Sequence, residues 1–389
     1  MEYVRPNYFD QFRCIAQDCP DTCCAGWQIV IDEQTQQKYK ENKSPFGNRL
    51  YNEIDWQEGC FRQYAGRCSF LNEDNLCDIY QEMGEDTLCR TCKMYPRYVE
   101  EFAGVREEFL CMSCPVVADL LLGRKEKTKL LYETKEEDTE DLEEVFDFFF
   151  YTKLEDSRDY MLDLLQNRSL SARHRFGIAL GYAHDMQRRI RDEQLFQIDA
   201  LLARYQKKNA LQFYEEKMQE MRNGRSRYKI GKALNYVFLQ MEIRQPSWKR
   251  WLERVSDNLY KKGDEDYLEK RKKFIADCKS EGYREVYELF TEQIVVYFIL
   301  HYYCGAVYDG RAYTKVKFAV MSTFFIEEMM LATYLMGKKL PKKSAWVAIV
   351  YQFARELEHA DENILAFEKA LTNHKVFSLK NMLAALAYD

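Results

Sequence analysis

Eleven of the thirteen cysteines lie in the first 114 residues of this 389-residue chain, and that cluster constrains the fold more than any other feature. They are Cys14, Cys19, Cys23, Cys24, Cys60, Cys68, Cys77, Cys89, Cys92, Cys111 and Cys114. The segments between them are short and broken by Pro, Gly and Asn, which is typical of loop-rich structure whose small local cores need cross-links. We therefore expect residues 1–123 to form a cysteine-rich module, with its last helix beginning at Cys114 and Pro115 and ending at Gly123.

Charge and hydropathy narrow the class of protein. The first residues, MEYVRPNYFDQF, lack the apolar core of a secretory signal, so we expect a cytoplasmic protein in which clustered cysteines favour metal binding over disulfides or free buried thiols. A net charge of −6 gives no general attraction for nucleic acid or anionic lipid, and neither is expected as a partner. The longest apolar run, Ile294 to Leu300, is too short to cross a membrane and predicts a buried helix.

The rest of the chain has a helical pattern. Charged residues dominate residues 124–144, which we expect to be a linker. Over residues 145–389 apolar residues recur at spacings of three and four, which predicts an all-helical domain of about ten helices. No glycine-rich loop follows a predicted strand, and Gly177 and Gly181 are expected to allow close helix packing. The predicted fold class is mainly α, with a loop-rich cysteine-cluster module followed by an all-helical domain.

The adjacent Cys23 and Cys24 need separate partners, because a disulfide between neighbouring residues is strained. In turn or extended backbone their side chains diverge, so one can face a metal while the other faces a second site or the core. All five histidines lie outside the module, which excludes a zinc site of two cysteines and two histidines within it. The pairs Cys89/Cys92 and Cys111/Cys114 have zinc-knuckle spacing, so the spacings leave a four-cysteine zinc site open beside an iron–sulfur cluster.

Several strings resemble one known family. FRCIAQDCPDTCCAGWQIVID, GRCSFLNEDNLCDIY, TCKMYPR and SCPVVADLLL are similar to the flagellin lysine N-methylase family of bacteria. The front part of that family is similar to a broader cysteine-cluster family described as zinc- or iron-chelating. The later strings YDGRAYTKVKFAV and FARELEHADEN also resemble the methylase family, so the resemblance spans most of the chain.

The resemblance implies a set of metal ligands. These are Cys14, Cys19, Cys23, Cys24, Cys68, Cys77, Cys92 and Cys114. Cys60, Cys89 and Cys111 lie outside the family pattern, so each zinc-knuckle pair loses one member and an iron–sulfur cluster, most simply of the 4Fe-4S type, is favoured. Eight thiolates could hold two four-ligand centres, or one cluster with the other cysteines in supporting roles.

The resemblance further implies transfer of a methyl group from S-adenosylmethionine to the side-chain amine of surface lysines on flagellin. A deprotonated lysine amine can attack a sulfonium methyl directly, provided that it is held in line in a dry, aromatic-lined slot. The candidate wall is VYFILHYYCGAVYDGRAY, in which Tyr302, Tyr308 and Asp309 are candidate catalytic residues. An aromatic helix core followed by a polar turn is the alternative interpretation.

A second candidate lies in FARELEHADEN. On one continuous helix, Arg355, Glu358, His359 and Glu362 would form a polar stripe. Arg355 could bind the carboxylate of the methyl donor, and Glu358 or His359 could accept a hydrogen bond from the donor or the lysine amine. A solvated face with salt bridges would show the same spacing.

The expected function is therefore a protein-lysine N-methyltransferase. The alternative is a non-catalytic iron–sulfur or zinc-binding module for interaction or assembly. A structural protein cross-linked by zinc is a third possibility.

Overall fold

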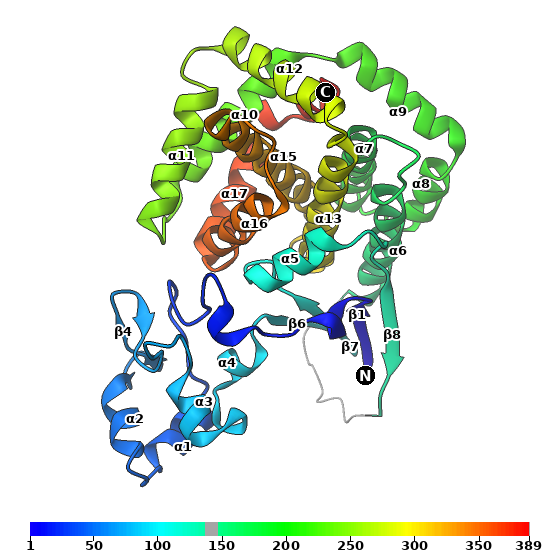
Figure 1. The fold of residues 1–389 in the computed structure, drawn as a ribbon. Helices are drawn as coiled ribbons and strands as arrows, with labels where there is room; N and C mark the ends of the chain where they lie inside the picture. The colour runs from blue at the N-terminus through cyan, green and yellow to red at the C-terminus, as the bar shows by residue number, and fades with distance from the viewer. Residues whose placement is uncertain (137–146, 389) are drawn as a thin grey trace.

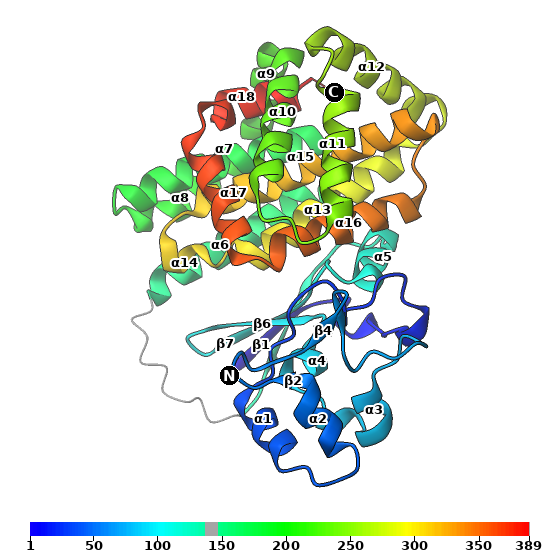
Figure 2. The ribbon, with the colours of Figure 1, turned by 90° about the vertical axis from the view of Figure 1, so that its left-hand side faces the viewer.

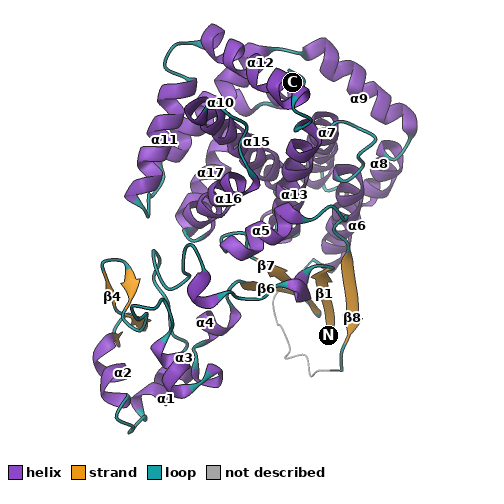
Figure 3. Cartoon of the chain, in the orientation of Figure 1, coloured by secondary structure: helices purple, strands orange, loops and turns teal. Residues whose placement is uncertain are grey.

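The computed structural model describes residues 1–136 and 147–388. Helices dominate it, as Figure 3 shows, and the predicted mainly α class is confirmed. A large helical body lies beside a small sheet, and a separate lobe of short helices and hairpins projects from the sheet (Figure 1).

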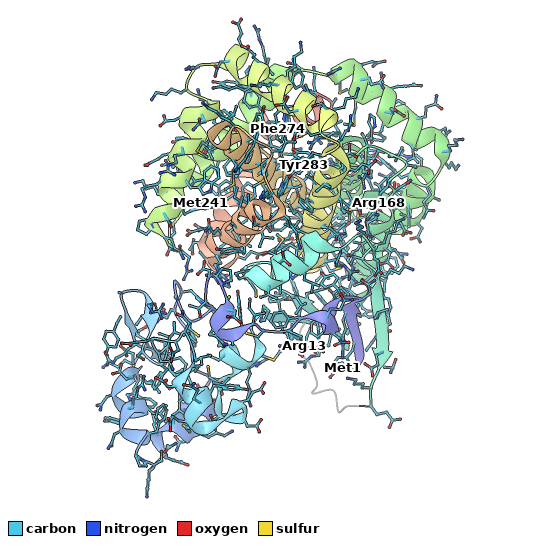
Figure 4. The ribbon with its side chains drawn as sticks, viewed as in Figure 1. Met1, Arg13, Arg168, Met241, Phe274 and Tyr283 are labelled. Carbon is cyan, nitrogen blue, oxygen red and sulfur yellow. The ribbon has the colours of Figure 1, made fainter. Side chains whose placement is uncertain are left out.

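The helical body is built from thirteen α-helices within the described residues, more than the ten or so expected. They are α6 (Phe148–Leu165), α7 (Ala172–Arg191), α8 (Ile198–Tyr205), α9 (Lys208–Met221), α10 (Gly224–Gln240), α11 (Pro246–Leu259), α12 (Asp264–Ser280), α13 (Arg284–Tyr302), α14 (Ala306–Asp309), α15 (Ala312–Gly337), α16 (Lys343–Glu358), α17 (Asp361–Asn373) and α18 (Leu379–Leu386). Side chains fill the space between these helices (Figure 4).

Helix α15 forms the centre of this body. In the described residues it is the one helix long and apolar enough to span a membrane, but 89% of its most apolar window is buried inside the protein. It packs against α7, α10, α11, α13 and α17. The run from Ile294 to Leu300 lies in α13 and is buried throughout, as predicted. Both apolar segments are core helices.

Glycines on α7 allow α9 to approach closely. A Cβ atom at Gly177 would collide with the Met218 side chain, and a Cβ atom at Gly181 would collide with the Tyr214 ring. Met218 and Tyr214 both lie on α9. The predicted packing role of the two glycines is confirmed.

A four-stranded sheet connects the helical body to the lobe, and the sequence analysis did not predict it. Its order is β6-β7-β1-β8, formed by Arg97–Phe102, Val105–Leu110, Glu2–Pro6 and Leu130–Thr134. Strand β1 pairs in parallel with β7 and antiparallel with β8. The expected linker of residues 124–144 is therefore partly wrong, since β8 lies within it and is held in the sheet by its pairing with β1. Residues 137–144 of that expected linker lie outside the described residues.

The lobe, residues 14–94, lies between β1 and β6 in the chain (Figure 2). It contains α1 (Glu33–Lys40), α2 (Gly47–Glu53), α3 (Asp78–Met83) and α4 (Arg90–Met94), with strand pairs β2 (Ile54–Asp55) and β3 (Cys60–Phe61), and β4 (Gln63–Tyr64) and β5 (Arg67–Cys68). A small core of its own includes Ile29, Leu50 and Phe70. The loop-rich character expected of this region is confirmed.

The sheet and α5 (Pro115–Gly123) share one hydrophobic core with the helical body. Val4 and Phe109 of the sheet and Leu121 of α5 are buried in it. Helix α5 has the predicted bounds and packs against α13 and α16. The domain boundaries expected after residues 123 and 144 stay predictions, although the continuous core crosses both.

Candidate functional site

A cavity of about 530 Å³ opens where the lobe meets α5 and α16. Seven of the eight cysteines implied as ligands line it: Cys14, Cys19, Cys23, Cys24, Cys77, Cys92 and Cys114. The eighth, Cys68, is buried beside it, and its backbone N–H donates to the carbonyl of Cys24 at 2.8 Å. Thiols separated by as many as 100 residues in the sequence are therefore gathered around one space.

Local structure explains how several of these thiols reach the cavity. Cys77 and Cys114 are the residues that precede the first turns of α3 and α5. Burial raises the pKa of both thiols, while hydrogen bonds from backbone N–H groups of the following turn lower it. First-turn N–H groups of this kind favour a thiolate.

Electrostatic interactions divide the cysteines into two groups. In the first, Cys23 interacts with Cys14 and Cys114, and Cys19 interacts with the same two residues. The second group contains Cys24, Cys68, Cys77 and Cys92, of which the last three each interact with Cys24, and also Cys89, whose side chain interacts with that of Cys92. The adjacent cysteines of the CPDTCC stretch therefore belong one to each group.

Cys23 and Cys24 do not point apart as expected. Their side chains interact with each other, which raises the pKa of Cys23 and lowers the pKa of Cys24 to about 7. Both line the same cavity. The expected divergence of the two side chains is therefore wrong, because the turn containing Cys23 and Cys24 brings both thiols to the junction of the two groups. That each thiol has its own metal partner stays a prediction.

Across residues 1–136 and 147–388, no three Cys, His, Asp or Glu side chains are close enough together to hold one metal ion. The ligand set therefore stays a prediction. Cys60, Cys89 and Cys111, which the family pattern leaves out, do not line the cavity. The sulfur of Cys60 instead accepts a hydrogen bond from the Gln28 amide at 3.0 Å.

The C-terminal string FARELEHADEN reaches this cavity, and Arg355 lies in its wall. Arg355 Nε donates to the carbonyl of Ser113 at 2.9 Å, and Nη2 donates to the carbonyl of Asp21 at 2.9 Å. Nη1 lies 2.7 Å from the Asp21 carboxylate. Ser113 immediately precedes Cys114, and Asp21 lies two residues before Cys23. Arg355 thus joins α16 to two cysteine-bearing loops.

The predicted polar stripe is not a single helix, which corrects the expectation. Helix α16 ends at Glu358, His359 follows it, and Glu362 lies in the first turn of α17. Nor is the stripe a solvated face, because Arg355 is 9% exposed and both Glu358 and His359 are largely covered by the lobe and α13. The interpretation as a surface with salt bridges is therefore excluded for these three residues.

Glu358 is held by two tyrosines of α13. The Tyr297 hydroxyl donates to its carboxylate at 2.9 Å and the Tyr302 hydroxyl at 3.0 Å. The Tyr297 hydroxyl also accepts the backbone N–H of Met112 at 3.0 Å, two residues before Cys114. Burial raises the pKa of Glu358 to about 7, while the two tyrosines oppose that rise. A carboxyl group of this kind can exchange a proton near neutral pH.

His359 lies between two aromatic side chains of the lobe and its junction. Its ring centroid is 4.7 Å from that of Trp27 and 6.1 Å from that of Tyr95. The Trp27 indole N–H in turn donates to the carbonyl of Cys23 at 2.6 Å. Burial, aided by Arg355 and Arg244, lowers the pKa of His359 to about 4. The imidazole is therefore neutral at physiological pH.

The other predicted catalytic residues lie apart from this group. Tyr308 is 54% exposed, and its hydroxyl donates to the carbonyl of Glu101. Asp309 lies 3.1 Å from Lys315 in an ion pair. Of the candidate aromatic wall, only Tyr297 and Tyr302 contact Glu358, so the structure divides the residues that the sequence analysis grouped together.

Sequence analysis missed three residues of the site: Asp21, Trp27 and Tyr95. Each lies inside a string that carried the family resemblance, so its place in the motif was the available signal. Their side-chain partners, Arg355 and His359, are more than 250 residues away in the chain, and no spacing rule could have paired them.

Comparison with known proteins decides the family. The family profile described as the FliB lysine N-methylase C-terminal domain matches residues 158–385, which is more than half of the chain. This chain belongs to the FliB lysine N-methylase family. The expected enzyme family is therefore confirmed, whereas the resemblance of the N-terminal cysteine strings to a chelating family lies outside the matched residues.

Individual relatives of the FliB family agree. The chain is 29% identical over 129 residues to a flagellar biosynthetic protein FliU of Salmonella muenchen, a match that covers 31% of this chain and 76% of the relative. It is 28% identical over 129 residues to a lysine-N-methylase of Salmonella typhimurium, covering 31% of this chain and 32% of the relative. A lysine-N-methylase of Salmonella choleraesuis matches to the same extent. No solved structure matches the chain significantly.

Proposed function

We propose that this member of the FliB family transfers methyl groups from S-adenosylmethionine to lysine side chains of flagellin, and that its cysteine-lined cavity holds iron–sulfur chemistry. Family membership supports the reaction class. The observation that carries the site assignment is the contact of FARELEHADEN with CPDTCCAGW, through Arg355 and Asp21 and through His359 and Trp27.

The thiol donor set is compatible with an iron–sulfur centre, which we propose in preference to zinc because of the family resemblance. Seven thiols line one cavity and an eighth lies beside it, with no histidine among the lining residues. Soft thiolate sets of this kind select iron–sulfur clusters or zinc, and the eight thiols that the family pattern selects could supply ligands for two four-ligand centres. When bound, such a centre would cross-link the loops around it and contribute to folding. We propose Cys14, Cys19, Cys23 and Cys114 for one centre and Cys24, Cys68, Cys77 and Cys92 for the other.

Glu358 is the best candidate for handling the proton of the substrate lysine. A lysine must lose its proton before its amine can attack a methyl group, and a carboxylate with a pKa near 7 is suited to accept it. Tyr297 and Tyr302 fix the orientation of that carboxylate. The rings of Trp27, Tyr95 and His359 provide the aromatic surroundings that favour a cationic substrate nearby.

We assign Arg355 a positioning role. Its three guanidinium nitrogens are all within contact distance of Asp21 or Ser113, so binding the methyl donor would require these contacts to break. Holding the backbone beside Cys23 and Cys114 is a role that needs no rearrangement. The alternative is that Arg355 binds the methyl donor, as the sequence suggested. The Arg355→Ala variant distinguishes the two roles.

Radiolabel transfer tests the proposal. Protein purified without oxygen should transfer tritium from methyl-labelled S-adenosylmethionine to purified flagellin, and the label should appear as methyl-lysine after hydrolysis. Glu358→Gln should lower the rate without reducing iron content, whereas Glu362→Gln, an exposed change on the next helix, should not affect either. Iron without methyl transfer would support a non-catalytic binding module instead.

A further inference from the structure

A second cavity, of about 810 Å³, lies away from the cysteines among α7, α15 and α17. Six of its lining residues are basic: His184, Arg188, Arg191, Arg311, Lys317 and Lys369. No Asp or Glu of the described chain lines it. The lining of this cavity is therefore positively charged, whereas the protein as a whole has a net charge of −6.

The inner part of this basic cavity has an unusual pair of side chains. Lys317 is 7% exposed, its Nζ donates to the carbonyl of Leu371 at 2.8 Å, and it lies 4.6 Å from the centre of the Tyr313 ring. Burial lowers its pKa to about 8. The Tyr313 hydroxyl is buried without a hydrogen-bond partner in the described part of the chain. A buried donor without an acceptor is costly, and an incoming anion would satisfy it.

The rim is open and partly apolar. Arg188, Arg311 and Lys369 have no ion-pair partner through a side chain in residues 1–136 and 147–388, and all three are exposed. Leu365 is 57% exposed at the same rim. The cations come from three different helices rather than converging on one point, which suits an extended ligand better than a single small anion.

We propose that this basic cavity docks an acidic, partly apolar peptide segment of the protein that the enzyme modifies. The inference rests on the proposed function, since a lysine methylase must hold a protein substrate. Carboxylates of the segment would face the rim cations and the Tyr313 hydroxyl, and an apolar side chain would cover Leu365. The methyl donor is not a suitable occupant, because its sulfonium cation would be repelled by the cationic lining.

Direct binding tests this inference without any methyl donor, so its failure is separable from failure of the methylase proposal. A fluorescein-labelled peptide of alternating Glu and Ser with two Leu residues is titrated with the full chain, and anisotropy is recorded. We expect Arg188→Glu combined with Lys369→Glu to weaken binding by about tenfold or more. Lys272→Glu combined with Lys273→Glu makes the same charge change on the exposed face of α12 and should weaken it by less than about twofold.

A second variant tests the inner part of the site. Tyr313→Phe removes a buried hydroxyl that has no partner, so it should leave the melting temperature unchanged or raise it, while weakening peptide binding by about threefold to tenfold. Equal weakening by the α12 variant, or no binding to wild type at about 50 mM salt, would overturn the inference. Binding of inorganic phosphate that Arg188→Glu abolishes, without peptide binding, would assign the cavity to a small anion and also overturn it.

Discussion

The imidazole of His359 packs against the indole of Trp27 in a tilted arrangement, with ring centroids 4.7 Å apart, although the residues are separated by 332 positions in the chain. The Trp27 indole N–H also donates to the carbonyl of Cys23. Trp27 therefore contacts both His359, which follows α16, and the backbone of the adjacent cysteines. The pair sits in a turn that is held from outside by the helical body, and it joins two groups of thiols around one cavity.

Arg355→Ala should destabilise the junction between α16 and the lobe. It removes charge-assisted contacts to Asp21 and Ser113, and we expect a loss of about 2–3 kcal/mol in the free energy of unfolding together with lower iron content. Denaturant titration and iron analysis measure the two effects. Lys343→Ala, at the start of the helix that carries Arg355, breaks an exposed pair with Asp119 of α5 and should cost less than about 0.5 kcal/mol. Unchanged stability and iron with lost donor binding would restore the donor-binding role.

Iron content should distinguish one metal centre from two. If the two thiol groups are separate centres, Cys14→Ser and Cys77→Ser should each remove about half of the iron, and the double variant should remove nearly all of it. Cys60→Ser and Cys278→Ser should retain the iron, because neither residue lines the cavity. Loss of all iron from either single variant would mean that the eight thiols serve one centre.

Ionisation of Glu358 and of His359 should change the free energy of unfolding in opposite directions as the pH rises. The pKa of Glu358 rises from 4.5 to about 7 on folding, so the folded state binds the extra proton and the free energy of unfolding falls as pH increases through that window. The pKa of His359 falls from 6.5 to about 4, so its contribution increases the free energy of unfolding as pH rises from about 4 to 6.5. The two effects largely cancel between about pH 4.5 and 6.5.

In the Glu358→Gln variant, the pH dependence of stability should show the contribution of His359 without the opposing effect of Glu358. The variant should lose stability as the pH falls below about 6.5, and at pH 8 it should exceed wild type by about 1–3 kcal/mol because no buried carboxylate has to ionise. Urea titrations at several pH values measure this. A variant that follows the wild-type profile would show that Glu358 is solvated in solution.

Gly181→Ala should destabilise the helical body by about 1–3 kcal/mol, because the added methyl group would collide with Tyr214 and push α9 away from α7. Gly337→Ala is the matched control, since a Cβ there meets only the Lys339 side chain at 3.9 Å and should be neutral or stabilising. Thermal unfolding of both variants tests the helix packing. Equal melting temperatures would mean that α7 and α9 are further apart in solution.

The sequence predicted the elements that depend on residues close together in the chain. Spacings of three and four residues predicted the helical body, and Pro115 with Gly123 bounded α5 correctly. The sheet was missed because its strands are only five or six residues long and β1 finds its partners about 100 positions away. Burial alternates along most of Val105–Leu110, but the sequence VREEFL does not show this pattern, because one of the buried positions is Glu107.

The site was predicted only in parts, and the reason is again long-range contact. The cysteine motif named the thiols that line the cavity, and FARELEHADEN named Arg355, Glu358 and His359. Their relation to one another depends on how α16 docks on the lobe, which no local pattern encodes. Tyr308 and Asp309 were grouped with Tyr302 by nearness in sequence, but α13 ends at Tyr302 and the turn before α14 leads Tyr308 and Asp309 to other surroundings.

The order of strands in the sheet also has a consequence for biosynthesis. Strand β1 leaves the ribosome first, yet its neighbours β7 and β8 are complete only when Leu110 and Thr134 have been translated. At typical elongation rates of about 5–20 residues per second, β1 waits on the order of 5–25 s for them. Every cysteine from Cys14 to Cys114 emerges during that interval, before β8 can close the sheet. The nascent chain therefore exposes its thiols in an open loop before the finished sheet anchors both ends of that loop.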